Sequence, residues 1–414
     1  MPWKGLGMNG KSKDKNEKLL LLGTSLAYIL IGLEVLFMIT PFALYFYGVY
    51  GPVLDFLSAN RLTAWTTEFF LPHMVFVSDP LLIALSWLQA LFVIGLVLFL
   101  LAAVLLYYGR MTGKGVVTFG PYSRIRHPQY LALAVSGFGL LLYWPRFIVL
   151  IFYVTMLFVY YLLARNEEWR MKREQPGSYE TYMAGTWMFL PSEPGGWLYR
   201  RLFGVIRPKG LGLFLAYGIV LGLSLGAAFA LRSRTLDHLP STQVDSMNLV
   251  SVYSRPLQDM EEIYRKALES AEVRRILAAD EVHLAYVMPG DFFLTGLILQ
   301  EGPRYSAAKL ERYPHLRDAG KSRHSGGLVK FFRLGYKFFQ TIGTTRRVYD
   351  YERLVFVATR DVHGKPVRAT DVLAVGVRRT PALVVDIDAE TLEIVEVAAA
   401  SGENAWGRLP MPNF

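Results

Sequence analysis

The sequence predicts a chain of two parts, an all-α polytopic membrane domain followed by a soluble α+β domain. Hydrophobic residues make up 53% of the 414 residues, a high share for a soluble protein, and they fall in long blocks before about residue 231. After that point, short β-branched runs alternate with charged segments. The expected division is a basic tail over residues 1–18, a membrane domain over 19–231 and a soluble domain over 232–414.

Five apolar blocks are candidates for membrane-spanning helices, because a helix needs roughly 20 apolar residues to cross a bilayer. They cover residues 19–49, 81–108, 130–144, 147–164 and 211–231. The first is too long for the apolar core of a cleaved signal peptide, which favours a retained span. Only Pro145 and Arg146 separate the third block from the fourth, and this predicts a tight helical hairpin. In the last block, Gly218, Gly222 and Gly226 form a small-residue face that lets a neighbouring helix approach closely.

The basic residues are distributed unevenly among the loops, and this distribution predicts an orientation. The tail and the connections over residues 110–130 and 165–209 are rich in lysine and arginine, whereas the connection over 50–80 has one basic residue, Arg61. The positive-inside rule places the basic loops in the cytoplasm. With five spans the soluble domain then lies outside the cytoplasm, and we expect the protein in a bacterial inner membrane.

The region after residue 232 has the pattern of an α+β domain. Charged residues at helical spacing predict a helix over 259–279, and β-branched or alternating runs predict strands over 282–288, 353–359, 382–387 and 392–397. Asp386 and Asp388 alternate at the end of the third of these runs, where a solvated strand face is preferred over a cation site. Residues 328–339 mix basic and aromatic side chains, as in a lipid-interface segment or an amphipathic core helix.

Two polar blocks beside the apolar ones contain the residues best suited to chemistry. The first has two arginines, a histidine and two tyrosines within eleven residues: Tyr122, Arg124, Arg126, His127 and Tyr130. The second contains Glu167 and Glu168. The predicted hairpin between the blocks brings both to one membrane face. The chain has no cysteine, and its other histidines lack metal-ligand spacing, so we expect no metal site.

The residue types in the two blocks allow two interpretations. Arginine and histidine suit a carboxylate or phosphate, and glutamates suit amines or sugar hydroxyls. A zwitterionic, nucleotide-like ligand such as S-adenosylmethionine fits this mixture. Alternatively, the basic and aromatic residues are ordinary interface anchors, and Glu167 with Arg170 forms a surface pair on a helix.

The order of the motifs resembles the isoprenylcysteine carboxyl methyltransferase family, whose relatives include phospholipid N-methyltransferases. The resemblance covers roughly residues 81–191. It comprises Gly120-Pro121-Tyr122, Arg126-His127-Pro128-Gln129-Tyr130, Glu167-Glu168, Gly177-Ser178-Tyr179-Glu180-Thr181-Tyr182 and Leu190-Pro191.

The resemblance implies a membrane enzyme that binds S-adenosylmethionine from the cytoplasm and a lipophilic acceptor from the bilayer. When the family's functional positions are carried over residue by residue, the resemblance implies these cofactor-binding residues: Tyr122, His127, Pro128, Tyr130, Glu167, Glu168, Tyr179 and Tyr182. The catalytic positions are Arg126, where the polar head of the acceptor meets the methyl group, and Glu167 and Glu168, either of which is a candidate general base. The expected partners are the membrane and a lipid or lipophilic small molecule, with no nucleic acid.

One element of the family pattern is missing. Members have Arg-Val-Pro ahead of the closing Leu-Pro, whereas residues 183–188 of this chain read Met-Ala-Gly-Thr-Trp-Met. The departure disfavours a prenylcysteine carboxylate as acceptor and leaves open a degenerate core that anchors the outer domain. A third hypothesis is an NADPH-dependent membrane reductase, since sterol reductases share an Arg-His-Pro-type motif. The number of spans and the glutamate pair favour the methyltransferase over the reductase.

Overall fold

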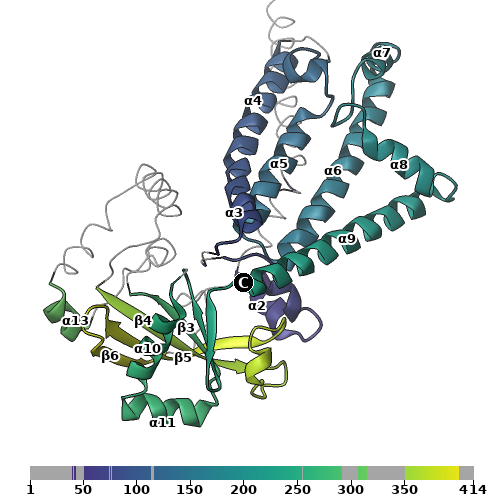
Figure 1. The fold of residues 1–414 in the computed structure, drawn as a ribbon. Coiled ribbons are helices and arrows are strands. Elements are labelled where there is room, and N and C mark those ends of the chain that lie inside the picture. Colours follow the sequence, from purple (N-terminus) through teal and green to yellow (C-terminus); the bar gives the residue numbers. More distant parts are fainter. Residues whose placement is uncertain are drawn as a thin grey trace, which may run out of the picture. The chain divides into compact units, whose positions relative to one another are not determined.

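The computed structural model describes residues 51–73, 75, 77–112, 116–253, 255–290, 306–314 and 350–400, together with Thr40 and Phe42 (Figure 1). The described chain forms two compact units. The first contains Ala90–Gly139 and Ile151–Val220, and the second contains Gly51–Gln89, Leu140–Leu150 and the described part of Leu221–Phe414. The basic tail, the apolar block over 19–49 and the mixed segment over 328–339 lie outside the described residues.

Within the described residues, three helices are long and apolar enough to cross a membrane: Pro80–Gly109, Phe147–Glu174 and Lys209–Asp237. The first of these stretches joins α3 (Pro80–Trp87), η2 (Leu88–Ala90) and most of α4 (Leu91–Met111). The others are α6 (Phe147–Glu174) and α9 (Lys209–Asp237). They confirm the apolar helices predicted over 81–108, 147–164 and 211–231. The block over 130–144 forms α5 (Pro128–Tyr143), which has 16 residues and is shorter than a typical span, so the count of five spans stays a prediction.

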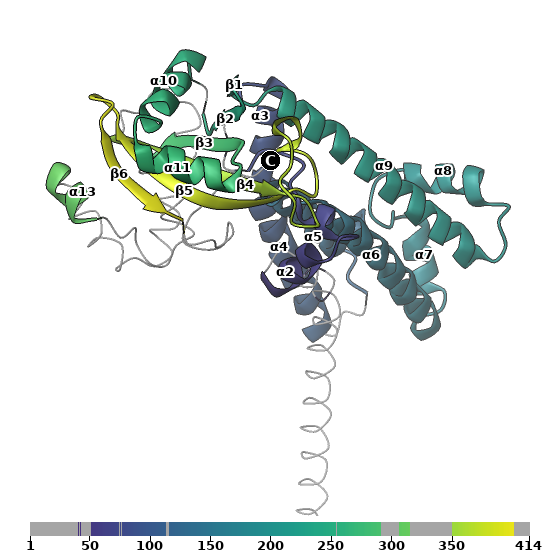
Figure 2. The same cartoon turned by 90° about the horizontal axis from the view of Figure 1, so that it is seen from below.

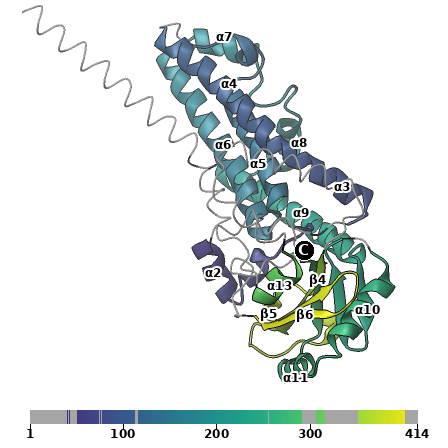
Figure 3. The same cartoon turned by 90° about the vertical axis from the view of Figure 1, so that its left-hand side faces the viewer.

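Helices α4, α5 and α6 run side by side (Figures 1 and 3). The predicted hairpin is formed by α5 and α6, with α5 ending at Tyr143 and α6 beginning at Phe147. The hydroxyl of Tyr153 donates to the carbonyl of Ala134 at 3.1 Å, and the rings of Tyr130 and Tyr160 stack with centroids 4.9 Å apart. From Tyr130 to Ala134 along α5, the contacting residue of α6 moves back from Tyr160 to Tyr153, as antiparallel packing requires.

Glycines allow α4 and α5 to cross at close range. A Cβ added to Gly139 would overlap the backbone nitrogen of Phe92, and one added to Gly95 would overlap the backbone of Ser136. The Ser136 hydroxyl also donates to the Phe92 carbonyl at 2.9 Å. Small residues at the crossing bring the two backbones into contact, which is the usual way apolar helices associate in membranes.

The predicted small-residue face of α9 has no such neighbour in the described part of the chain. Gly218, Gly222 and Gly226 are exposed, and a Cβ added to any of them meets no described atom within 4 Å. The described residues therefore do not confirm the expectation that a helix packs on this face.

The second unit contains one six-stranded sheet in the order β1-β2-β3-β4-β5-β6. Its strands are β1 (Ser241–Val244), β2 (Met247–Ser251), β3 (Leu284–Pro289), β4 (Tyr351–Arg360), β5 (Arg378–Asp388) and β6 (Ile394–Ala399). Only β2 and β3 pair in parallel, and the other neighbours are antiparallel. The last four strands confirm the four predicted from sequence, whereas β1 and β2 were not predicted.

Two helices, α10 (Leu257–Ala267) and α11 (Ala271–Asp280), connect β2 to β3 and pack on one face of the sheet (Figure 2). They lie where the sequence predicts a single helix. The break occurs because the Ser270 side chain accepts from the Val273 amide and caps a new helix. Met260 and Ala267 bury their side chains against Phe356 in the core of this face.

The remaining helices of the described chain are short. They are α2 (Gly51–Ala59), α7 (Ser178–Ala184), α8 (Pro194–Phe203) and α13 (Ala307–Arg312).

Asp386 and Asp388 do not form a solvated strand face, and that expectation is wrong. Asp386 is 1% exposed and accepts two hydrogen bonds from Arg353, at 2.7 and 2.9 Å, while Lys309 forms an ion pair with it. Asp388 accepts from the Tyr313 hydroxyl at 2.6 Å. Side chains of α13 and the residue after it cover both carboxylates. Within the described ranges, no cluster of three His, Asp or Glu side chains is arranged to hold a metal.

Candidate functional site

A short turn and a proline position the Arg-His-Pro motif at the start of α5. Gly120 has a φ of +61°, a left-handed conformation that glycine adopts without a steric penalty, and it begins the 3-10 turn η3 (Gly120–Ser123). Pro128 is the first residue of α5, where its missing N–H leaves no helical hydrogen bond unmade. The amide of Leu131 donates to the His127 carbonyl at 3.2 Å, so the motif residues immediately precede the helix.

Residues 183–188, the segment that departs from the resemblance described above, lie alongside the motif. The Arg126 amide donates to the Trp187 carbonyl at 2.8 Å, and the His127 amide donates to the Met188 carbonyl at 3.2 Å. The Trp187 amide returns a hydrogen bond to the Arg124 carbonyl at 3.0 Å. These bonds form a short parallel bridge that ties the segment to the motif without an arginine of its own.

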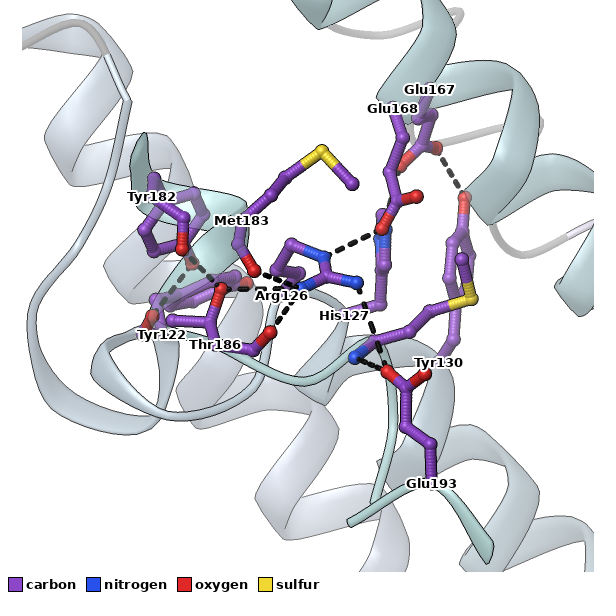
Figure 4. A network of polar contacts seen from close by, with 11 residues as sticks. Tyr122, Arg126, His127, Tyr130, Glu167, Glu168, Tyr182, Met183, Thr186 and Glu193 are labelled. Atoms are coloured by element: carbon purple, nitrogen blue, oxygen red, sulfur yellow. Dashed lines mark hydrogen bonds and ion pairs between the residues drawn. The ribbon is translucent and has the colours of Figure 1, made fainter. Parts of the chain in front are cut away.

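Arg126 is at the centre of the polar network (Figure 4). Its Nε donates to Oε1 of Glu168 at 2.6 Å, and one terminal nitrogen donates to the carbonyls of Met183 and Thr186. The other terminal nitrogen lies 3.7 Å from a carboxylate oxygen of Glu193. The side chain is 7% exposed. Arg126 thus joins α5, α6 and the segment after α7.

His127 lies between the two glutamates of α6. Its Nδ1 is 3.4 Å from Oε2 of Glu167, and its Nε2 is 3.6 Å from Oε1 of Glu168. The residue is 3% exposed, yet neither ring nitrogen makes a hydrogen bond of good geometry to a described group. Burial by itself lowers the pKa of His127, but the two carboxylates outweigh burial and raise it above 6.5. The two carboxylates therefore favour the imidazolium form more than water does for a free histidine.

Glu167 also bonds to Tyr130, whose hydroxyl donates to Oε1. The Glu167 side chain is 26% exposed, against 8% for Glu168. The two adjacent glutamates thus differ in environment, because one is enclosed by Arg126 and the other reaches toward the surface. A ligand reaches Glu167 more readily than Glu168.

The three other predicted tyrosines, Tyr122, Tyr179 and Tyr182, pack around the site. The Tyr122 hydroxyl contacts the Ala102 carbonyl and Oε1 of Gln129, each at 3.2 Å, which fixes the turn against α4 and α5. Tyr182 donates to the Tyr122 carbonyl at 2.6 Å. Tyr179 is 4% exposed, and its ring lies 5.8 Å from that of Tyr182. All three are within the same network, and the hydroxyls of Tyr122 and Tyr182 are engaged by backbone carbonyls.

Glu193 also belongs to the site, and the sequence did not predict it. The Glu193 backbone is left-handed, with a φ of +40°, and this conformation is uncommon for a residue other than glycine. Its amide donates to the Leu190 carbonyl at 3.2 Å, so the turn after Leu190-Pro191 directs the carboxylate back to Arg126 and to the Met188 amide. In the sequence, Pro191 alone indicated a turn here, and it did not indicate that Glu193 would contact Arg126.

The cluster retains negative charge. Among the described residues, the carboxylates of Glu167, Glu168 and Glu193 face the cations Arg126 and, when protonated, His127. One carboxylate is therefore left without a matching cation, even when His127 is charged. In a partly dry site this imbalance favours a ligand that brings a positive charge.

We compared the chain with protein-family models, with curated proteins and with solved structures, and none matches it.

Proposed function

We propose that the chain is an integral membrane methyltransferase that uses S-adenosylmethionine and acts on a lipophilic acceptor. The observation that supports this most is the convergence of the start of α5 with Glu167 and Glu168 of α6 in one cluster with a residual negative charge. The three candidate membrane-spanning helices support a lipophilic acceptor. The proposal also places this site on the cytoplasmic side and the sheet on the other side of the membrane.

The donors and acceptors of the cluster fit the cofactor. Both ring nitrogens of His127 are buried, face the carboxylates of Glu167 and Glu168 and make no hydrogen bond of good geometry to a described group, so in the proposed complex a ligand carboxylate or hydroxyl replaces a glutamate oxygen as partner of one nitrogen. Glu167 is partly exposed and suits an ammonium group or ribose hydroxyls. When bound, S-adenosylmethionine supplies a methyl group on a positively charged sulfur.

The residues of the chain supply alignment and proton acceptance. In-line displacement depends mainly on holding the reacting atoms at the right distance and angle. The hydrogen bond between Arg126 and Glu168 holds these two side chains in place beside the proposed ligand. An acceptor hydroxyl or amine also requires a base. Glu167 is better placed for this than Glu168, because Glu168 is held by Arg126.

A second candidate function is that of a non-catalytic membrane anchor, and one observation favours it. The Arg126 side chain is nearly closed off and is engaged by Glu168 and by the carbonyls of Met183 and Thr186. These contacts leave little capacity for the polar head of an acceptor. In this reading the network is a structural joint and neither S-adenosylmethionine nor NADPH binds.

Calorimetric titration of the full chain in detergent or nanodiscs separates the two functions. We expect micromolar binding of S-adenosylmethionine and S-adenosylhomocysteine, lost in His127→Ala and weakened in Glu167→Gln. His363→Ala is the matched control, because this histidine is exposed in the sheet region and should not affect binding. Folded wild-type protein that binds neither ligand would instead support the anchor.

The proposed orientation has its own test. The chain has no cysteine, so a single introduced cysteine reports one position. Val362 is 44% exposed, and a Val362→Cys variant should react with a membrane-impermeant maleimide in intact cells. Ser123→Cys, beside the site, should react only after permeabilisation. The opposite pattern would place the sheet in the cytoplasm.

A further inference from the structure

Helix α8 has an exposed face that mixes large apolar side chains with arginines. Trp197, Leu198 and Leu202 are 58, 49 and 59% exposed, and Arg200 and Arg201 are exposed beside them. The Arg201 guanidinium lies 5.4 Å from the centre of the Trp197 ring. The described residues of this unit leave the face uncovered, and such a face is costly in water.

The opposite face of α8 is packed against the start of α9. The rings of Tyr199 and Phe203 stack with centroids 5.5 Å apart. A Cβ added to Gly212 would lie 3.1 Å from the Tyr199 hydroxyl and 3.5 Å from Cβ of Phe203. Because α9 is a candidate membrane span that begins at Lys209, this packing holds α8 at the end of a span. Helices in that position lie near the level of the lipid head groups.

The charge of this segment is of one sign. Residues 194–209 contain Arg200, Arg201, Arg207 and Lys209 and no acidic residue. Long arginine side chains can extend to phosphate groups while their neighbours enter the apolar layer, and tryptophan is enriched at the same boundary. The combination matches an acidic lipid surface better than a protein partner, which would have to cover apolar and cationic groups at the end of a span.

We propose that α8 lies in the membrane interface and binds acidic phospholipid head groups. Trp197, Leu198 and Leu202 enter the boundary of the acyl layer, and Arg200 and Arg201 contact lipid phosphates. This inference does not depend on the proposed methyl transfer.

The position of α8 links the lipid surface to the polar network. The helix begins one residue after Glu193, whose carboxylate contacts Arg126 and the Met188 amide. The backbone that fixes Glu193 therefore continues directly into the lipid-binding helix. Anchoring α8 at the interface would restrict the residue that braces Arg126.

Spin labels on introduced cysteines test the position of α8 in the full chain, reconstituted in nanodiscs. Labels at Leu198→Cys and Leu202→Cys should collide more with dissolved oxygen than with a water-soluble nickel chelate. Glu180→Cys, exposed on α7, is the aqueous control, and Val220→Cys, 42% exposed on α9, is the membrane control. Labels on α8 that behave like the label at position 180 would overturn the proposal.

The preference for acidic lipid is measured separately, with spin-labelled phosphatidylglycerol and phosphatidylcholine. Each arginine near an acidic surface contributes about fivefold in lipid association. The double variant Arg200→Gln and Arg201→Gln should therefore lose much of the preference for phosphatidylglycerol. The control with the same charge change is Arg265→Gln and Arg275→Gln on the exposed surface of α10 and α11, which should retain it. An unchanged preference in the α8 variant would overturn the assignment of acidic lipid as the occupant.

Discussion

Nε of Arg126 donates a 2.6 Å hydrogen bond to Oε1 of Glu168, a residue 42 positions later in the chain. The two side chains are 7 and 8% exposed, so water competes weakly for either charge. Hydrogen bonds between ionised groups are stronger than neutral ones, and a buried pair that loses one member leaves the other uncompensated. Together with the contacts of His127 to Glu167 and Glu168, this contact joins the Arg-His-Pro motif to the glutamate pair.

Replacing Arg126 should destabilise the protein strongly. Arg126→Ala leaves Glu168 and the carbonyls of Met183 and Thr186 without their donor, and breaking a buried ion pair costs about 3–5 kcal/mol. Thermal unfolding in detergent measures the loss. Arg124→Ala is the control, because Arg124 is exposed two residues away and its removal should have an effect of about 0.5 kcal/mol or less. Equal melting temperatures for the two variants would show that the pair contributes nothing.

The raised pKa of His127 predicts a loss of stability on the alkaline side. Burial opposes the charge on His127, but Glu167 and Glu168 raise its pKa above 6.5. The folded state then holds a proton that the unfolded state releases near pH 6.5. The resulting stabilisation is complete below that pH and is lost as pH rises through the folded-state pKa.

The measurement is the free energy of unfolding of wild type and His127→Asn at a series of pH values above 6.5. The difference between the two proteins should shrink as pH rises. A difference that grows with pH would mean that His127 is neutral in the folded state, and burial would then outweigh the two glutamates.

His73, in the other unit, should make stability depend on pH in the opposite direction, with a loss on the acidic side. Its ring lies between Phe69 and Trp144, with centroids at 5.0 and 4.7 Å. Burial and the charge of Arg146 lower its pKa from 6.5 to about 3. The unfolded chain therefore takes up a proton first, and stability falls as pH drops from 6.5 toward 3. His73→Phe should weaken this acid dependence in the same unfolding assay, and an unchanged acid profile would count against it.

Two glycine substitutions compare a position where a neighbouring helix packs closely with a position where no described helix does. Gly139→Ala places a methyl group against the Phe92 backbone and should lower the melting temperature, since overpacking costs about 1–3 kcal/mol. Gly222→Ala meets no described atom within 4 Å, and alanine is the better helix former, so stability should be unchanged or raised. A larger loss for Gly222→Ala would indicate that the α9 face is occupied.

The carboxylate of Asp386 should be essential for the sheet region. Asp386→Asn removes the charge that compensates Arg353 and, together with Glu396, Lys309 in a buried setting, at a cost of about 3–5 kcal/mol. Denaturant unfolding of the full chain measures the change. The matched variant Asp371→Asn alters an exposed carboxylate and should have little effect. If both variants unfold at the same denaturant concentration, the buried network contributes no net stability.

The confirmed elements are those whose signal is local. The apolar helices Pro80–Gly109, Phe147–Glu174 and Lys209–Asp237 and the strands β3 to β6 could be predicted because hydrophobic periodicity reflects which side of an element is buried. The strands β1 and β2 have 4 and 5 residues, too few for a periodic pattern to stand out. β1 and β2 pair with each other in a local hairpin, and β2 also pairs with the distant strand β3.

In the candidate site too, some contacts could be predicted from the sequence and others could not. The sequence was sufficient to place Arg126 and His127 near Glu167 and Glu168, because a helical hairpin returns the chain to its starting face. It could not show that Glu193 completes the network, since that contact depends on a left-handed turn after Pro191. Nor could it show that Tyr122 faces the α4 backbone.

The sequence alone determined the apolar helices, the four later strands and the approach of Arg126 and His127 to Glu167 and Glu168, because hydrophobic periodicity and short loops act over neighbouring residues. Tertiary structure decided which polar groups became partners. Asp386 is alternating and polar in the sequence but buried in the fold, since Lys309 and Arg353 reach it from distant positions. Likewise, within the described part of the chain, a neighbouring backbone reaches Gly139 but not Gly222. Both outcomes depend on long-range packing, which brings together charges and surfaces that no local pattern records.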